Sequence, residues 1–474
     1  MHMKTASRRR PRTRLLRTAA GVAGGLALAA ALAACSSSGS SSSAAGSAGS
    51  TGSAAGGTAG GAAGGAAAIA AALQKPATLT FWAWAPQSQA IVAAFEKKYP
   101  KVKVNLVNAG TATTEYTKLQ NAIKAGSGAP DVAQIEYYAL PQFALAGSLA
   151  NLDNFGLGGI KNQFSAAVWD SVSVNGALVG LPQDTGPMAL FYNKTVFDKY
   201  HLQVPATWAE YVADAKKLHA ANPKAYITND VGDPGFVTSM IWAAGGHPYV
   251  TSGTKDVTIN LQDPGSKKFT SLWSPLISAG QLAPVTSWTS QWYQGLANGS
   301  IASLVTGGWM GVDLESGVPA GKGDWRVAAM PEWAAGQSAT SENGGSSDAV
   351  LSSSKNQLAA AGFLEFMNAG QGAQISAAAG DFPASSVILS SPSFLGVTPT
   401  YFGGQAINKV LAQAAGTVLP GWTYLPFQVY ANSIFPDTVG QAYTGKTSLD
   451  AGLAAWQQQS ASYGSQQGFS VVSK

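Results

Sequence analysis

The sequence has few charged residues and almost no cysteine. Cys35 is the only cysteine among 474 residues, so no disulfide can form within the chain. Charged residues make up 11% of the chain, against about 25% in ordinary globular domains. The histidines after residue 34 are His201, His219 and His247, and their spacing matches no metal site. These absences exclude a disulfide scaffold, and we expect neither a bound metal nor another cofactor.

Positive charge is also scarce outside the start of the chain. Of 29 basic and 24 acidic residues, seven basic and no acidic residues lie within residues 1–34. Without that segment, 22 basic residues face 24 acidic ones, a formal charge of −2, and Arg326 is the only arginine. Nucleic-acid binding requires a basic surface that neutralises phosphates, so this class is excluded. A weakly charged chain fits an uncharged ligand.

Residues 1–34 have the composition of a signal peptide. Basic residues precede a run of small apolar residues that ends in Leu32-Ala33-Ala34, directly before Cys35. These four residues resemble the bacterial lipobox, in which the cysteine is lipidated and becomes the mature N-terminus. The alternative is a retained signal-anchor helix, but the apolar run is short for a membrane span. The pair Arg8-Arg9 leaves twin-arginine export open beside the general secretion route.

Residues 35–75 are predicted to form a flexible tether. Ser, Gly and Ala make up almost all of this segment, and such a composition is typical of a random coil. Its glycine-rich tract at 56–65 precedes no strand–helix pair, so it does not predict a phosphate-binding loop. About 400 residues follow, enough for two domains or two lobes.

The next segment alternates between strand and helix patterns. Strands are predicted at 78–84, 102–106 and 132–135, where apolar residues alternate with others or form a short run. Helices are predicted at 87–99 and 113–125, where apolar residues recur at helical spacing. Strand–helix steps joined by short loops predict a parallel sheet.

The most specific pattern in the chain lies between Leu181 and His219. It reads D-x-G-P-x-x-L-F-Y-N-K from Asp184, and then F-D-K-Y-x-L-x-V-P-x-T-W-x-E from Phe197. Thr207 and Glu210 within it predict a capping box at the start of a helix. The pattern resembles the segment entering the second lobe of bacterial extracellular solute-binding proteins of family 1, the maltose-binding-like capture components of ABC sugar importers.

Other segments carry the same resemblance. They are FEKKYPKVKV from Phe95, APDVAQ from Ala129, GLANGSIASLVTGGWM from Gly295 and VLSSSKNQLAAAGFLEFM from Val350. The third is similar to the family pattern F-x-x-G-x-A-A-M-x-x-x-G-x-W, with Trp309 at the aromatic position. The resemblance covers nearly everything after Thr78.

The resemblance implies a two-lobed α/β fold of the periplasmic-binding-protein type, with a ligand cleft between the lobes. Each lobe is expected to contain a mostly parallel sheet flanked by helices. The first lobe would comprise residues 76–184 and 346–388, and the second lobe residues 185–345 and 389–474. The chain would therefore cross between the lobes three times.

Aromatic residues are the main candidates for contacting a ligand. A sugar ring has apolar faces and a rim of hydroxyls, so its site requires flat aromatic side chains together with carboxylates and amides. The candidate ligand contacts are Trp82, Trp84, Glu136, Tyr137, Tyr138, Asp184, Trp242, Trp309, Asn343, Trp422 and Tyr430. For each tryptophan the alternative is a place in the core, and for Asp184 and Asn343 a turn-forming role. The resemblance supports Asp184 and Trp309.

No catalytic motif is present, and no Gly-x-Ser-x-Gly elbow occurs. The best carboxylate pair for glycoside hydrolysis would be Glu136 with Asp184. The sequence therefore predicts a monomeric sugar-binding lipoprotein on the outer face of the cytoplasmic membrane, which the resemblance pairs with the transmembrane permease subunits of an ABC importer. The alternatives are a secreted glycan-processing enzyme and a surface sensor or adhesion lipoprotein with the same fold.

Overall fold

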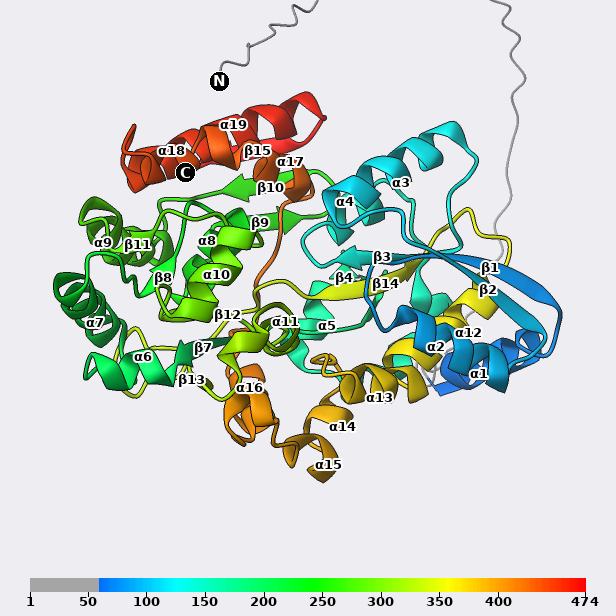
Figure 1. Ribbon diagram of the computed structural model, residues 1–474. Coiled ribbons are helices and arrows are strands. Elements are labelled where there is room, and N and C mark those ends of the chain that lie inside the picture. Colours follow the sequence, from blue (N-terminus) through cyan, green and yellow to red (C-terminus); the bar gives the residue numbers. More distant parts are fainter. Residues whose placement is uncertain (1–58) are drawn as a thin grey trace, which may run out of the picture. The chain divides into compact units, whose positions relative to one another are not determined.

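The computed structural model describes residues 59–474 (Figure 1). The predicted signal peptide (residues 1–34), the predicted lipidation site Cys35 and residues 36–58 of the predicted tether lie outside the described residues.

A helix occupies the end of the predicted tether. Helix α1 (Ala59–Ala72) packs on helix α12 (Gln357–Asn368), and Ile69 and Leu73 are buried there. A Cβ atom on Gly362 would lie 2.7 Å from Ile69 Cγ2, so this glycine lets the two helices approach closely. The prediction of a flexible tether up to residue 75 is therefore wrong for residues 59–75. The alanines that suggested a coil favour a helix once there is a surface to pack on.

The first lobe is built on a five-stranded sheet in the order β2-β1-β3-β14-β6. Its strands are β1 (Ala77–Trp82), β2 (Val102–Val107), β3 (Val132–Glu136), β6 (Leu181–Pro182) and β14 (Ser346–Val350). β1 runs parallel to β2 and β3, as predicted, whereas β14 runs antiparallel to β3 and β6. Ser346, the first residue of β14, pairs with Glu136, the last residue of β3.

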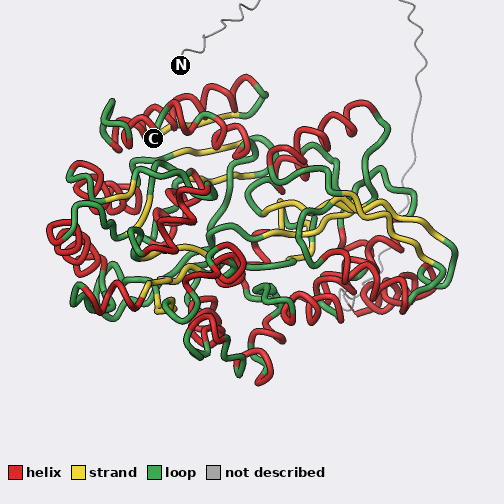
Figure 2. Tube along the Cα trace, viewed as in Figure 1, coloured by secondary structure: helices red, strands yellow, loops and turns green. Residues whose placement is uncertain are grey.

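Helices lie on both faces of this sheet (Figure 2). Besides α1 and α12 they are α2 (Ser88–Lys98), α3 (Thr113–Ala125), α4 (Leu140–Leu145), α5 (Ala166–Ser171) and α13 (Gln371–Ala378). Leu79 and Phe81 of β1 are buried, whereas Trp82 is half-buried, so the strand alternates as the sequence predicted. A short hairpin of β4 (Ser173–Val174) and β5 (Ala177–Leu178) precedes β6.

The central sheet of the second lobe is antiparallel, which corrects the prediction of a mostly parallel sheet. Strand β7 (Met188–Asn193) lies between β12 (Ser303–Gly307) and β13 (Trp325–Ala329) and is antiparallel to both. β7 begins where the chain enters the lobe, whereas β12 and β13 end there, since Met188 pairs with Gly307 and Ala189 with Ala329. The expectation of a parallel sheet came with the resemblance, and the apolar pattern within a strand does not determine whether its neighbours run parallel or antiparallel to it.

Helices and smaller sheets complete the second lobe. Its helices include α6 (Lys194–Lys199), α7 (Trp208–Ala221), α8 (Pro234–Ala243), α9 (Pro264–Ser278), α10 (Ser290–Asn298), α11 (Met310–Gly317), α16 (Ile407–Ala415), α17 (Gln428–Ser433), α18 (Gly440–Tyr443) and α19 (Leu449–Gln466). The smaller sheets are β8 (Thr228–Asn229) with β11 (Leu282–Ala283), and β9 (Tyr249–Ser252) with β10 (Asp256–Ile259) and β15 (Ser470–Ser473). Helix α7 begins with the predicted capping box of Thr207 and Glu210.

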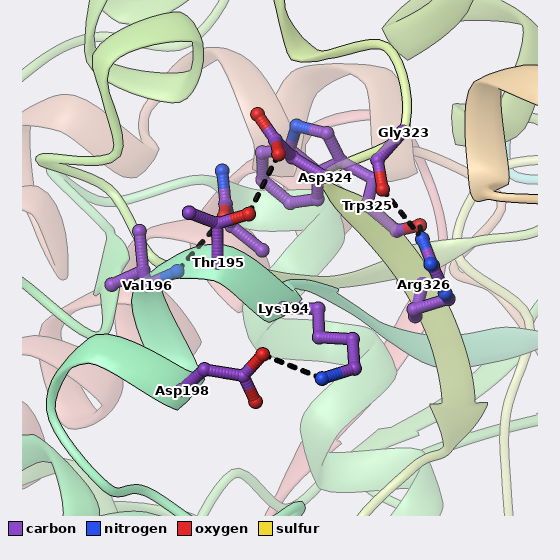
Figure 3. A network of polar contacts seen from close by, with 9 residues as sticks. Lys194, Thr195, Val196, Asp198, Gly323, Asp324, Trp325 and Arg326 are labelled. Atoms are coloured by element: carbon purple, nitrogen blue, oxygen red, sulfur yellow. Dashed lines mark hydrogen bonds and ion pairs between the residues drawn. The ribbon is translucent and has the colours of Figure 1, made fainter.

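A polar network fixes the end of β7 that lies farthest from the crossing between the lobes (Figure 3). Asn193 Oδ1 accepts the backbone N–H of Val196 at 3.1 Å and so caps helix α6. Thr195 Oγ1 donates to Asp324 Oδ1 at 2.6 Å, and Lys194 forms an ion pair with Asp198. The polar residues of the N-K-x-x-x-D segment are therefore structural in this chain, which explains their spacing without a ligand.

Three crossing segments join the lobes and lie side by side. The Asn343 N–H donates to Gly186 O at 2.8 Å, the Thr185 N–H donates to Phe382 O at 3.1 Å, and the Ala384 N–H donates to Gln183 O at 3.1 Å. Buried apolar residues of the first lobe come from residues 69–181 and 349–384, and those of the second lobe from residues 188–330 and 382–456. After the third crossing, α14 (Ser386–Leu389) and α15 (Pro392–Leu395) lead to α16.

Candidate functional site

A cleft of about 650 Å³ lies where the two lobes meet. From the first lobe it is lined by the start of α3 and the residues after β3, and from the second by the segments around β8, α8, β12 and α17. The charged or aromatic residues that line it are Glu136, Tyr138, Asp230, Asp233, Phe236, Trp288, Trp292, Trp309 and Tyr424. The ends of β3 and β12 both lead into it, at the edge where open α/β sheets bind ligands. Its volume lies within the usual range of ligand pockets.

Trp309 forms part of the cleft wall directly after β12. Its indole Nε1–H donates to Asn343 O at 2.7 Å, which joins this wall to a crossing segment. A Cβ atom on Gly307 would lie 2.3 Å from Trp309 Nε1, so the glycine before Trp309 leaves room for the indole. A Cβ atom on Gly186 would lie 2.2 Å from Asn343 O. The glycines of the G-G-W and D-x-G-P segments thus hold this tryptophan in place.

A second tryptophan, Trp288, lies beside Trp309 on the cleft wall. The two ring centroids are 5.8 Å apart with the planes tilted by 32°, and the Trp292 ring lies 5.1 Å from that of Trp288. Trp288 is 50% exposed, whereas Trp292 is buried. The backbone φ of Trp288 is +68°, a conformation that L-residues with bulky side chains rarely adopt. Trp288 is not among the site residues predicted from the sequence, and nothing in the local sequence indicates its positive φ.

Glu136 and Tyr138 provide a polar wall on the first lobe. The backbone N–H of Glu136 donates to the Tyr116 hydroxyl oxygen at 2.9 Å, and the Tyr116 ring packs edge-on against Tyr138 at 6.1 Å. Burial raises the pKa of the Glu136 carboxyl to about 7, although hydrogen bonds from the Tyr138 and Tyr116 hydroxyls act in the opposite direction. A carboxylate held in this way can accept a hydrogen bond from a ligand hydroxyl.

Asp230 and Asp233 face the cleft from the second lobe. Asp230 accepts the Trp273 indole N–H and the Gly232 N–H, both at 2.8 Å, and burial raises its pKa to about 7. Asp233 caps helix α8 by accepting the Gly235 N–H at 2.7 Å. Sequence reasoning did not single out either residue, because an Asp in a turn or at a helix start has a sufficient structural role.

Basic side chains are missing from the lining of this cleft. Among the described residues that line it, three are carboxylates and none is Lys, Arg or His. Asn343, whose amide accepts from Thr306 Oγ1 at 3.0 Å and donates to Ser239 Oγ at 3.3 Å, adds an oriented polar group. An anionic ligand would meet only like charge here, whereas an uncharged polyol can hydrogen-bond to carboxylates and amides.

The structure brings four predicted site residues together on the cleft: Glu136, Tyr138, Trp309 and Asn343. Two other predicted site residues, Tyr137 and Asp184, lie behind the cleft. The Tyr137 hydroxyl donates to Asp184 O at 2.7 Å, and Asp184 Oδ1 accepts the Ser346 N–H at 2.6 Å. Asp184 therefore stabilises the junction of two crossing segments, and burial together with the charge of Asp381 raises its pKa.

The remaining predicted site residues lie outside this cleft. Trp82 and Trp84 pack against the core of the first lobe. Trp242 and Trp422 stack on each other in the second lobe, 5.1 Å apart at 9°, and both are buried. Tyr430 stacks on Tyr463 at 3.6 Å. These five residues therefore occupy packing positions in the structure and do not line the cleft.

Two further findings concern residues 59–474 as a whole. No group of His, Cys, Asp and Glu side chains within them is arranged to hold a metal ion. None of their helices combines the length and the apolar character that crossing a membrane requires.

The fold and the cleft define a two-lobed solute-binding protein. Residues 82–374 match the model of the family described as bacterial extracellular solute-binding protein, and the chain belongs to this family.

Similar proteins include solved structures with bound sugars. The ABC transporter associated binding protein from B. animalis subsp. lactis Bl-04, in complex with beta-1,6-galactobiose, is 45% identical, with a TM-score of 0.76 over 83% of this chain and 99% of that one. The galacto-N-biose-/lacto-N-biose I-binding protein of Bifidobacterium longum, in complex with lacto-N-biose, is 28% identical, with a TM-score of 0.73 over 83% and 98%. The lactose-binding protein of Rhizobium radiobacter is 26% identical over 60% of this chain and 69% of its own length.

Proposed function

We propose that this chain is the substrate-binding protein of an ABC importer and captures an uncharged saccharide between its two lobes. The observation that carries the proposal is the cleft itself, with tryptophan faces, three carboxylates and no basic residue in its described lining. Aromatic faces match the apolar faces of sugar rings, and the acceptors match their hydroxyl rims. The sugars named for the similar proteins support the same ligand class.

The proposed ligand contacts are Trp309, Glu136, Tyr138 and Asn343, together with Asp230 and Asp233. Trp309 would stack on a ring face, and the carboxylates would accept hydroxyl hydrogens from both sides. A ligand held by groups of both lobes favours the closed arrangement by its differential affinity for it. The three adjacent crossing segments are suited to act as the hinge. The closed form would then deliver the sugar to the transmembrane subunits of the importer.

We propose further that Cys35 carries a lipid and that the protein works as a monomer at the outer face of the cytoplasmic membrane. The Leu-Ala-Ala-Cys sequence supports the lipid, and membership of an extracellular family supports the side of the membrane. Because α1 packs on α12, only the residues before 59 would then link the folded part to the lipid anchor.

A binding role is proposed in place of hydrolysis. Hydrolysis requires two carboxyl groups that flank the scissile bond. Glu136 lines the cleft, but Asp184, the other member of the predicted pair, is engaged by Ser346 behind it. Across the cleft, Asp230 already accepts the Trp273 indole N–H and Asp233 already caps helix α8.

Calorimetric titration and thermal unfolding of residues 36–474 test the proposal. Three neutral sugars, β-1,6-galactobiose, lacto-N-biose and lactose, are compared with a disaccharide that contains a uronic acid. At least one neutral sugar should bind and raise the unfolding midpoint by mass action, whereas the anionic sugar should not bind. Binding of the anionic sugar alone, or release of monosaccharides during incubation, would contradict the proposal.

A further inference from the structure

We infer that one end of the first lobe is a docking surface for the anionic headgroups of a phospholipid bilayer. This basic face lies where β1 and β2 begin, and it consists of six exposed lysines: Lys75, Lys97, Lys98, Lys101, Lys103 and Lys355. The inference concerns how the folded part lies on a membrane, so it goes beyond sugar capture and does not depend on the ligand of the cleft.

The turn between α2 and β2 brings four of these lysines together. The backbone N–H of Ala77 donates to Lys101 O at 3.2 Å, so the turn that carries Lys75 lies beside Lys101. Lys97 and Lys98 occupy the last turn of α2, directly before this point of the chain. The end of α1, the end of α2 and the start of β2 therefore meet at one place.

The other two lysines flank the start of β1. Thr78 of β1 pairs with Lys103 of β2. The side-chain N–H of Asn356 donates to Thr78 O at 3.3 Å, and Asn356 follows Lys355 directly. A segment that is more than 250 residues away in sequence thus adds its lysine to the same end of the sheet.

The basic face and the cleft lie at opposite ends of the first lobe. Strand β1 begins at the basic face and runs parallel to β3, whose last residue, Glu136, lines the cleft. The six residues of β1 span about 20 Å. A bilayer in contact with the basic face would therefore leave the cleft accessible to a solute.

The charge of this region differs in sign from that of the rest of the chain. Residues 73–104 and 352–366, together with Asp131 beside them, hold six lysines and three carboxylates, a formal charge of +3. The remaining 16 basic and 21 acidic residues after residue 34 give −5, and residues 35–95 contain no acidic residue. Such an asymmetric charge attracts one end of a protein to an anionic surface and repels the other end.

Local structure accounts for only part of the basic face. The two lysines at the end of α2 are favoured by the helix dipole, and Lys103 lies 3.6 Å from Glu96. Within residues 59–474 no ion pair involves Lys75, Lys101 or Lys355. These three lysines lack a partner there that would explain their position, and their ammonium groups are available to phosphate.

The route of the chain favours a bilayer as the partner. Lys75 closely follows α1, and the chain before α1 leads back to the proposed lipid on Cys35. The 14 residues of α1 are about 21 Å long, whereas residues 35–59 can span at most about 80 Å. An anchored chain is therefore long enough for the basic face to reach the bilayer.

The expected contact is electrostatic and does not insert into the bilayer. Val107, one of the exposed large apolar residues, lies at the other end of β2 from the basic face. Binding through ammonium groups alone should weaken steeply as salt screens the charges.

Co-sedimentation of residues 36–474 with vesicles tests the inference. At about 0.05 M salt the chain should bind vesicles that contain phosphatidylglycerol at least about tenfold more tightly than vesicles of phosphatidylcholine alone, and about 0.5 M salt should release it. A variant that combines Lys75→Gln, Lys97→Gln and Lys101→Gln should bind the anionic vesicles at least about tenfold more weakly.

A matched control separates the basic face from net charge. The control removes three exposed lysines of the second lobe, by Lys216→Gln, Lys224→Gln and Lys267→Gln. It should bind the anionic vesicles within about twofold of the parent chain. Both triple variants should keep the unfolding midpoint and the sugar affinity of the parent chain, because none of the six substituted lysines lines the cleft.

Equal losses in the two triple variants, equal binding of the parent chain to neutral and anionic vesicles, or no binding to either would overturn the inference. Tighter binding to a soluble poly(glycerol phosphate) than to the vesicles would overturn the choice of a bilayer as the partner. A parent chain that binds anionic vesicles through the basic face but binds no saccharide would contradict the proposed function and support this inference.

Discussion

Tryptophan residues fill two different roles in this chain, and burial separates them. Trp309 is half-buried and lines the cleft, whereas Trp242 is 1% exposed and donates its indole N–H to Leu419 O at 2.8 Å. In the sequence each stands close to a pair of glycines, so the local pattern does not distinguish them. Only the packing of the second lobe places Trp309 on the cleft and Trp242 in the core.

Alanine at these two positions should therefore give opposite results. Trp309→Ala should weaken the binding of a neutral disaccharide at least about 30-fold, which is typical of a tryptophan hot spot. Trp242→Ala should lower the free energy of unfolding by about 3–5 kcal/mol, because it empties a buried site, and change the affinity less than twofold. Titration calorimetry and urea unfolding measure both effects. Equal losses of affinity in the two variants would contradict the assignment.

The effect of Glu115 on the free energy of unfolding depends on pH. Its side chain is fully buried in helix α3, and neither carboxylate oxygen has a hydrogen-bond partner among the described residues. Burial, and secondly the charge of Asp348, raises the pKa of Glu115 to about 8. Between about pH 4.5 and pH 8 the unfolded chain loses this proton while the folded chain keeps it. The contribution of Glu115 to stability therefore falls as the pH rises through this window.

Glu115→Gln should remove the loss of stability that the Glu115 carboxyl causes at high pH. The variant should be about 1–3 kcal/mol more stable than the parent chain at pH 8 and nearly equal to it at pH 4.5. Urea unfolding at the two pH values measures the difference. Glu315→Gln, at an exposed position of α11, is the control and should behave like the parent chain at both. A stabilisation of Glu115→Gln that is the same at both pH values would exclude titration as its cause.

At the scale of the elements, the first lobe was the more predictable part. The strand–helix order and the parallel pairing of β1 with β2 and β3 follow from alternation and helical spacing. In the second lobe, the capping box at Thr207 predicted the start of α7. The directions of β12 and β13 could not be predicted, because the sequence of an apolar strand does not show which strand lies beside it or which way that strand runs. The positive φ of Trp288 was equally invisible, since the residues around it are held by Asn229, which is about 60 residues away in sequence.

Helix α1 is the element for which composition was misleading. The Ser/Gly/Ala composition predicts a tether up to residue 75, yet Ile69 and Leu73 within it are each 4% exposed. These two apolar side chains, four residues apart, pack against Gly362 of α12. Composition averaged over the segment concealed them.

Removal of one of these side chains should show that α1 belongs to the folded unit. Leu73→Ala should lower the free energy of unfolding by about 2–4 kcal/mol. Gln74→Ala, at the adjacent exposed position, should change it by less than about 0.5 kcal/mol. Urea unfolding followed by tryptophan fluorescence compares the two variants. An unchanged midpoint in Leu73→Ala would indicate that α1 contributes nothing to the stability of the first lobe.

On the scale of the whole molecule, buried carboxyl groups gather at the cleft and the crossing segments. Burial raises the pKa of Glu136, Asp230, Glu342 and Asp348 to about 7, and that of Asp381 to about 6. No basic residue offsets them inside the cleft, since none of the described residues that line it is Lys, Arg or His. The place where the lobes meet thus combines a low dielectric with acidic groups. This combination favours neutral ligands and makes the stability of the folded state depend on pH.

The pH dependence of stability should reflect this arrangement. In the unfolded chain these groups titrate near pH 4, whereas in the folded chain they hold their protons to about pH 6 or 7. The folded state therefore binds more protons than the unfolded state between about pH 4 and pH 7, and its free energy of unfolding should fall as the pH rises through that range, by about 2 kcal/mol or more. Above about pH 8 the curve should flatten, because both states are then ionised. Urea unfolding between pH 5 and pH 8.5 measures the slope, and stability that rose from pH 5 to pH 7 would mean that these carboxyl groups are ionised in the folded protein and stabilised by partners across the cleft.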